Sequence, residues 1–343
     1  MSRYKLKTNI KKRLLIVIGC FSIIIGIVFG YRIIILEKLE QELKSFPKDE
    51  EIDDNYRENI SSIDNADDNH VEDDPDNIDV LTIGNSDMYS AFNPLQLWHE
   101  HGITSFVAAG PMQNMKLSYY MLKKILTVQK PKLIIIETAN FFEKREEIDR
   151  QGYKYTAMKY SYSLFKKTDE WQNIKKESYL NDKSLRNRIE NQKGYYFNQK
   201  VESNSKDFSY MKMTKKREQF PAITQMYLPK IMSLIKEYDI SVLFVCFPTA
   251  TTGSYARHNM VSDYAKENGI PFLDFNVDQY GTGFDWHTDS RDGGNHLNYS
   301  GALKMTKYLG EYLSQNYNFV DKRDNSLFHE WNDAYQKLMK RVK

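Results

Sequence analysis

From residue 78 onward, short apolar runs alternate with stretches of helical periodicity. Five runs have the length of β-strands, at residues 78–83, 105–108, 132–137, 241–247 and 271–275. Four helical patterns accompany them, at residues 117–127, 221–238, 256–268 and 300–315. Several of the expected strands are apolar throughout, which is typical of strands buried on both faces. The pattern predicts an α/β fold, with a parallel sheet inside a three-layer α/β/α domain.

Residues 14–36 form an apolar run that is interrupted only by Ser22, Tyr31 and Arg32. At about 1.5 Å per residue, a helix of this length crosses a bilayer core of about 30 Å. Six Lys and Arg residues precede the run, and such charges stay on the cytoplasmic side. We expect an uncleaved single-pass anchor in the cell membrane, with residues 1–13 in the cytoplasm and the rest outside. A cleaved signal peptide is the alternative, although the run is long for one and no small-residue cleavage motif follows.

The net charge of +2 conceals a strong segregation of charge along the chain. Residues 1–36 carry seven Lys or Arg and no acid, whereas residues 37–79 carry seventeen acids against four bases. The acidic stretch has little apolar periodicity, so it cannot bury enough surface to offset the entropy of ordering. We therefore expect residues 37–77 to be a flexible acidic tether, and residues 78–343 to be the extracytoplasmic domain.

Residues 144–220 interrupt the alternation of strands and helices. They contain nineteen Lys or Arg against eleven acids, many tyrosines and no strand pattern. One interpretation is a solvated helical insertion. The other is a lid or docking face for an anionic polymer, whereas nucleic acid is disfavoured outside the cell. In the second interpretation, four lysines attract negative charge and three aromatic rings stack on sugars: Lys166, Lys167, Lys175, Lys176, Tyr195, Tyr196 and Phe197.

Two polar motifs lie where strands are expected to end, which is where open parallel sheets bind their ligands. Ser86 directly follows the first strand, and a serine hydroxyl needs a base that a third group orients. His296 follows a glycine-rich loop just before the last helix, with Asp292 close enough to fix its tautomer. Taken singly, the serine is equally explained as a helix cap and the histidine as an exposed turn residue.

The joint pattern of an early G-N-S turn and a late loop with Asp, His and Asn resembles the SGNH/GDSL hydrolase superfamily. It is similar in particular to membrane-anchored cell-envelope members related to the teichoic acid D-alanylation protein DltD. The resemblance implies a flavodoxin-like fold with Ser86 as nucleophile, His296 as base and Asp292 as orienting acid. It also implies oxyanion donors at the Gly110 N–H and the Asn140 side chain.

The chain departs from the family pattern in two places. The block that contains Asn140 lacks the usual glycine and aspartate, and three residues instead of two separate Asp292 from His296. Either the last loop bulges at its two glycines, or another acid such as Asp289 orients the histidine.

The resemblance implies a serine esterase or acyltransferase that acts on an envelope polymer, either a glycan or a teichoic acid. It requires no organic cofactor or metal, and it suggests a membrane-bound O-acyltransferase as a partner. The alternative is a non-catalytic protein that binds such a polymer or serves as a scaffold for the membrane acyltransferase.

Overall fold

The computed structural model describes residues 77–145, 148, 152–165, 182–205 and 207–342. Its centre is a parallel five-stranded sheet in the order β2-β1-β3-β4-β5. The predicted parallel α/β fold is confirmed, and every strand lies within two residues of its expected place. The strands are β1 (Val80–Gly84), β2 (Ser105–Ala109), β3 (Leu133–Glu137), β4 (Ser241–Cys246) and β5 (Phe272–Asp274).

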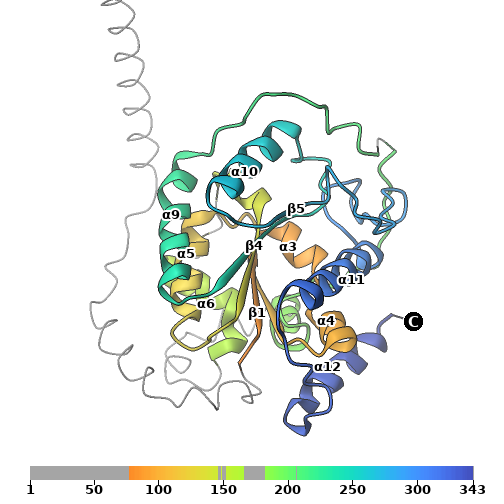
Figure 1. The fold of residues 1–343 in the computed structure, drawn as a ribbon. Coiled ribbons are helices and arrows are strands. Elements are labelled where there is room, and N and C mark those ends of the chain that lie inside the picture. The colour runs from red at the N-terminus through yellow and green to blue at the C-terminus, as the bar shows by residue number, and fades with distance from the viewer. Residues whose placement is uncertain (1–76, 146–147, 149–151, 166–181, 206, 343) are drawn as a thin grey trace, which may run out of the picture. The chain divides into compact units, whose positions relative to one another are not determined.

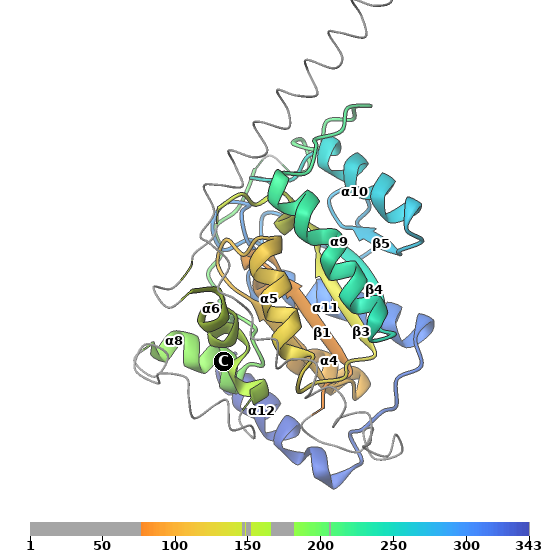
Figure 2. The ribbon, with the colours of Figure 1, turned by 90° about the vertical axis from the view of Figure 1, so that its left-hand side faces the viewer.

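Helices cover both faces of the sheet, so the domain has the three layers that the pattern predicted (Figure 1). Figure 2 shows α5, α6 and α9 in front of the strands, and α3, α4 and α11 lie on the opposite face. Helix α10 packs against β5, and α12 packs on α4. The helices are α3 (Ser86–Ala91), α4 (Pro94–His101), α5 (Met115–Ile125), α6 (Gly152–Ser161), α9 (Ala222–Glu237), α10 (Tyr255–Glu267), α11 (Tyr299–Asn316) and α12 (His329–Met339).

Asparagine side chains begin several of these helices. In each case the side-chain oxygen accepts a hydrogen bond from a backbone N–H of the first turn, which would otherwise lack a partner. The capping residues are Asn85 for α3, Asn93 for α4, Asn114 for α5 and Asn298 for α11. The short helix α4 and the terminal α12 were not among the predicted elements.

In its described parts, the insertion contains short helices up to Asn191, whereas residues 192–205 and 207–220 contain no helix. After α6 come η3 (Tyr162–Phe165), α8 (Lys183–Arg186) and η5 (Asn187–Asn191). The chain then reaches the outer edge of β2, where Lys193 O accepts the Val107 N–H at 2.9 Å, and continues past α3, where the Tyr196 N–H donates to Tyr89 O at 2.7 Å. This segment therefore covers an open strand edge.

One expectation for the insertion is wrong, and another concerns residues that the structure does not describe. Tyr195 is fully buried beside Tyr299 and Ala302, so its ring cannot stack on a sugar. The four lysines proposed to attract a polymer lie outside the described residues. So do the expected anchor at 14–36 and nearly all of the expected tether at 37–77. Within the described ranges, no helix is both long enough and apolar enough to cross a membrane.

Candidate active site

Ser86 lies at the carboxyl edge of the sheet, in the turn that joins β1 to α3. A Cβ atom on Gly84 would lie 2.6 Å from Cβ of Met88 and 2.8 Å from Cβ of Glu137, so only glycine allows this tight turn. Asn85 then caps α3 by accepting the Asp87 N–H at 2.9 Å. The strand order reverses at β1, which makes this edge the topological switch point of the sheet.

The loop that carries His296 folds back on itself as the bulge interpretation expected. Gly293 and Gly294 have φ values of 73° and 106°, which few other residues adopt. The Asp292 carboxylate closes the loop, because its Oδ1 accepts the backbone N–H groups of Asn295 at 3.2 Å and His296 at 2.7 Å.

The three predicted side chains form one hydrogen-bonded chain. His296 Nε2 lies 2.8 Å from Ser86 Oγ, and His296 Nδ1 lies 2.6 Å from Asp292 Oδ2. Burial raises the pKa of Asp292, but hydrogen bonds from His296 and the charges of His296 and Arg291 outweigh it, so the net pKa is lowered. An ionised Asp292 holds the proton on Nδ1, which leaves Nε2 to accept the Ser86 hydroxyl proton.

Asp289, the alternative orienting acid, bonds side chains of α11 and not the imidazole. It is fully buried, with Oδ2 2.6 Å from Lys304 Nζ and Oδ1 accepting the Ser300 hydroxyl at 2.7 Å. Among the hydrogen bonds of the described residues, none joins it to His296. Asp289 therefore anchors the start of α11, and Asp292 is the acid that contacts the imidazole.

The two expected oxyanion donors are engaged elsewhere. The Gly110 N–H donates to Gln113 Oε1 at 2.8 Å, and Gln113 Nε2 donates to Ser118 Oγ at 3.0 Å. Asn140 is fully buried, and its Nδ2 lies 3.4 Å from the same Ser118 Oγ. Both groups thus belong to a buried polar network in this structure. Ser86, the first residue of α3, has a backbone N–H with no acceptor inside the helix.

This network gives a prediction for Asn140→Ala. We expect the variant to lose about 1–2 kcal/mol of stability, because Ser118 loses a buried partner, and to keep kcat within about tenfold of the wild type. Thermal melting and ester hydrolysis would measure the two effects, with Ser118→Ala as the matched control. A kcat loss of about 10²–10³ with unchanged melting would instead restore Asn140 as an oxyanion donor.

Two buried carboxyl groups beside the triad were not anticipated. Burial raises the pKa of Asp87 to about 6, although His296 and Arg291 lower it. Burial and the neighbouring Asp87 also raise the pKa of Glu137 well above its usual range. The sequence did contain a sign of these buried carboxyl groups, because one acid directly follows Ser86 and another ends the apolar β3. Of the two, Asp87 interacts electrostatically with His296.

Asp87→Asn should make the protein more stable at alkaline pH. The folded-state pKa of about 6 lies above the usual 3.8, so the cost of ionising Asp87 is absent below about pH 4 and complete above about pH 6. We expect a gain of about 3 kcal/mol at pH 8, most of which disappears at pH 4. Melting curves at both pH values test this, with the exposed Asp333→Asn as control. A loss of stability at pH 8 would contradict it.

Aromatic and cationic side chains line the region next to Ser86. Tyr89 lies one helical turn after the serine, and its ring meets that of Tyr196 edge-on, with centroids 6.1 Å apart. The guanidinium of Arg188 lies 4.3 Å from the Tyr89 ring centroid, and that of Arg291 lies 4.9 Å from the Tyr196 centroid. Tyr196 is partly exposed, unlike its neighbour Tyr195.

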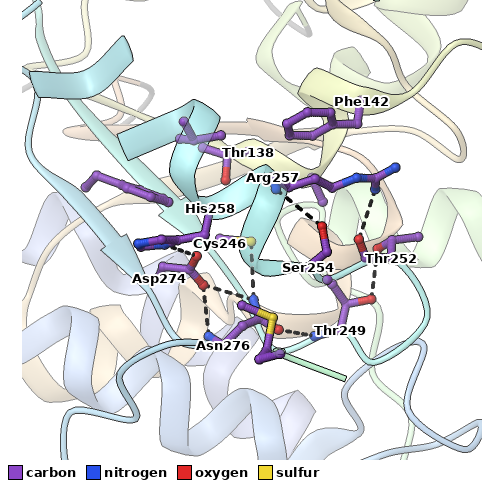
Figure 3. A pocket seen from close by; sticks show the side chains of 15 residues that line it. Thr138, Phe142, Cys246, Thr249, Thr252, Ser254, Arg257, His258, Asp274 and Asn276 are labelled. Carbon is purple, nitrogen blue, oxygen red and sulfur yellow. Dashed lines mark hydrogen bonds and ion pairs between the residues drawn. The ribbon is translucent and has the colours of Figure 1, made fainter. Parts of the chain in front are cut away.

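A second histidine–aspartate pair faces a pocket at the ends of β4 and β5 (Figure 3). His258 Nδ1 lies 2.8 Å from Asp274 Oδ2, and Asn276 donates its backbone N–H to Asp274 Oδ1 at 2.9 Å. The nearby Cys246 is a poor nucleophile, because burial and the charge of Asp274 raise its pKa well above the usual value. This pair has the same contact between an imidazole and a carboxylate as His296 and Asp292, but no serine hydroxyl bonds His258 among the hydrogen bonds of the described residues.

No protein-family model matches this chain, and no curated protein matches it. A structure described as a lipolytic protein of the G-D-S-L family from Desulfitobacterium hafniense is 12% identical, with a TM-score of 0.37 over 68% of this chain and 98% of that one. An acylhydrolase structure from Bacteroides fragilis is 12% identical, with a TM-score of 0.35 over 78% and 99% of the two chains. A GDSL-like lipase structure from Bacteroides thetaiotaomicron is 11% identical, with a TM-score of 0.34 over 76% and 98%. At these values the likeness carries no argument about activity, which is drawn from the geometry of the site.

Proposed function

We propose that this protein is a serine esterase or acyltransferase of SGNH type, with Ser86 as nucleophile, His296 as base and Asp292 as orienting acid. The observation that carries the proposal is the unbroken chain of hydrogen bonds from Ser86 Oγ through the imidazole to the Asp292 carboxylate. A serine hydroxyl so placed can pass its proton to Nε2 as it attacks a carbonyl carbon.

The proposed reaction has two steps, acylation and deacylation of the serine. Ser86 Oγ bonds to the acyl carbon, its proton moves to His296 Nε2, and the same proton leaves with the departing alcohol. Water or a hydroxyl of the acceptor then attacks the acyl carbon and passes its proton to Nε2. The bond between the acyl carbon and Ser86 Oγ breaks, Oγ takes that proton back, and the carboxylic acid or the new ester leaves. The Ser86 backbone N–H, which has no acceptor inside α3, is our candidate donor for the oxyanion, and the Gly110 N–H can join it only if the Gln113 side chain moves away.

Covalent labelling with a fluorophosphonate probe tests the proposal. We expect the wild type to be labelled at Ser86, Ser86→Ala and His296→Ala to remain unlabelled, and His258→Ala to be labelled like the wild type. Thermal melts would establish that each variant is folded. A folded wild-type protein that is not labelled, yet binds an envelope polymer, would favour the non-catalytic alternative.

As substrate we propose an envelope polymer, either a glycan or a teichoic acid. Support comes from the aromatic and arginine side chains next to Ser86 and from the excess of nineteen Lys or Arg over eleven acids in residues 144–220. Converting four lysines to glutamate should weaken polymer binding and leave turnover of a small ester intact: Lys166, Lys167, Lys175 and Lys176. Binding that neither these changes nor added salt affects would contradict polymer docking.

We also propose that the domain lies outside the cell behind a single anchor at residues 14–36, in the manner of envelope proteins related to DltD. The support is the basic segment that precedes the apolar run. A membrane-bound O-acyltransferase would be a suitable source of acyl groups there. A reporter fused after residue 343 should be active only outside the cytoplasm, and a new N-terminus close after the apolar run would instead indicate secretion.

A further inference from the structure

Arg291 connects the two segments that carry the proposed catalytic residues. Its Nη1 donates to Ser90 Oγ at 2.8 Å and to the backbone oxygen of Leu297 at 3.1 Å. The Ser90 hydroxyl in turn donates to the backbone oxygen of Ser86 at 2.6 Å. One guanidinium therefore reaches both the helix that begins at the nucleophile and the loop that contains the base.

The same side chain also lies beside the orienting acid. Arg291 Nε is 3.9 Å from Asp292 Oδ2, and the backbone N–H of Arg291 donates to His296 O at 3.1 Å. The residue is only 9% exposed. A cation at this depth is expensive to desolvate unless anions and hydrogen bonds compensate, and its polar partners here are Asp292, the Ser90 hydroxyl and Leu297 O.

These contacts close a ring around the site, from Ser86 to His296, Asp292, Arg291, Ser90 and back to Ser86. We propose that Arg291 is a positioning residue that keeps the Ser86 helix and the His–Asp loop in register for proton transfer. This inference rests on the proposed function for its catalytic consequence. The guanidinium does not contact Ser86 Oγ or the imidazole nitrogens, so it acts through Ser90 and Asp292.

The geometry predicts how substitutions divide between kcat and KM. Arg291→Met removes both the positive charge and the hydrogen-bond donors of the guanidinium. If Ser86 and His296 then move apart by about 1 Å, we expect kcat to fall about 100-fold with KM unchanged. Arg291→Lys keeps the charge, but its single, shorter-reaching nitrogen cannot replace both the Nη1 bonds to Ser90 and Leu297 and the Nε contact with Asp292, so it should recover part of the loss. Ser90→Ala keeps the arginine and breaks only the link to Ser86, and should cost about tenfold in kcat.

Hydrolysis of an activated ester, with exposed Arg217→Met as the matched control, measures these effects. A rise in KM with unchanged kcat in Arg291→Met would overturn the positioning role and make the arginine a substrate-binding group. Wild-type kcat in both Arg291→Met and Ser90→Ala would also overturn the inference.

A second measurement separates this inference from the proposed function. In nitrogen-labelled protein, the proton on His296 Nδ1 should give a downfield resonance through its bond to Asp292, and His258 provides an internal reference through Asp274. We expect Arg291→Met to shift or broaden the His296 resonance and to leave that of His258 unchanged. An unchanged His296 resonance would overturn the inference even in an active enzyme. A wild type that is not labelled by fluorophosphonate would refute the esterase proposal, while this measurement would still decide the role of Arg291 in holding the loop.

Discussion

His296→Ala should lower the turnover of an activated ester about 10⁶-fold, and adding Ser86→Ala to it should lower turnover no further. The physical reason is that the serine and the imidazole act as one unit through the 2.8 Å contact between Oγ and Nε2. Once the base is absent, the hydroxyl has no acceptor for its proton, so its removal costs nothing more. Single and double variants compared on one substrate measure this coupling.

The second histidine–aspartate pair, His258 and Asp274, supplies the matched control for this experiment. His258→Ala removes an imidazole with an equivalent bond to a carboxylate, but no serine hydroxyl contacts it among the hydrogen bonds of the described residues. We expect its turnover to stay within a few-fold of the wild type. Losses from Ser86→Ala and His296→Ala that multiply in the double variant would show that the two residues act independently.

Asp292→Asn should lower turnover about 10⁴-fold, because an amide no longer holds the proton on Nδ1 and the wrong tautomer is favoured. The folded structure should persist, since the amide oxygen can still accept the backbone N–H groups of Asn295 and His296 that close the loop. Steady-state kinetics and a thermal melt on the same preparation would separate the two effects.

Asp289→Asn is the comparison for Asp292→Asn, with the opposite expectation. Loss of the buried carboxylate that bonds Lys304 and Ser300 should cost on the order of 2 kcal/mol of stability. Turnover per folded molecule should change only a few-fold, since Asp289 does not contact the imidazole. If Asp289→Asn stays well folded and loses activity as Asp292→Asn does, the assignment of the orienting acid is wrong.

The sheet was predictable because its signal is local. All residues of β1 and β3 are buried, so their sequences are mostly apolar where other strands would alternate. The Ser86 and His296 motifs were recognisable for a related reason, since Gly84 and the two glycines after Asp292 mark the sharp turns that expose them.

The polar partners were not predictable, because each depends on the turn geometry or the tertiary contacts of the folded chain. Gly110 follows its strand as expected, but only the folded chain shows that Gln113 takes its N–H. Asn140 meets Ser118 across two elements, and Arg291 meets Ser90 from 201 residues away. Tyr195 and Tyr196 are adjacent and chemically identical, yet one is buried and the other partly exposed. Their environments come from tertiary packing, which residue type alone does not encode.

The segment along β2 also bears on solubility. A parallel sheet whose outer strand is open presents unpaired N–H and C=O groups, which recruit strands from other molecules. Here Lys193 O occupies part of that edge by accepting the Val107 N–H. A version of the domain from which residues 182–197 were deleted would therefore expose a self-complementary surface. Such a truncation should assemble into higher-order aggregates, so the insertion protects the protein from self-association as well as bordering the region next to Ser86.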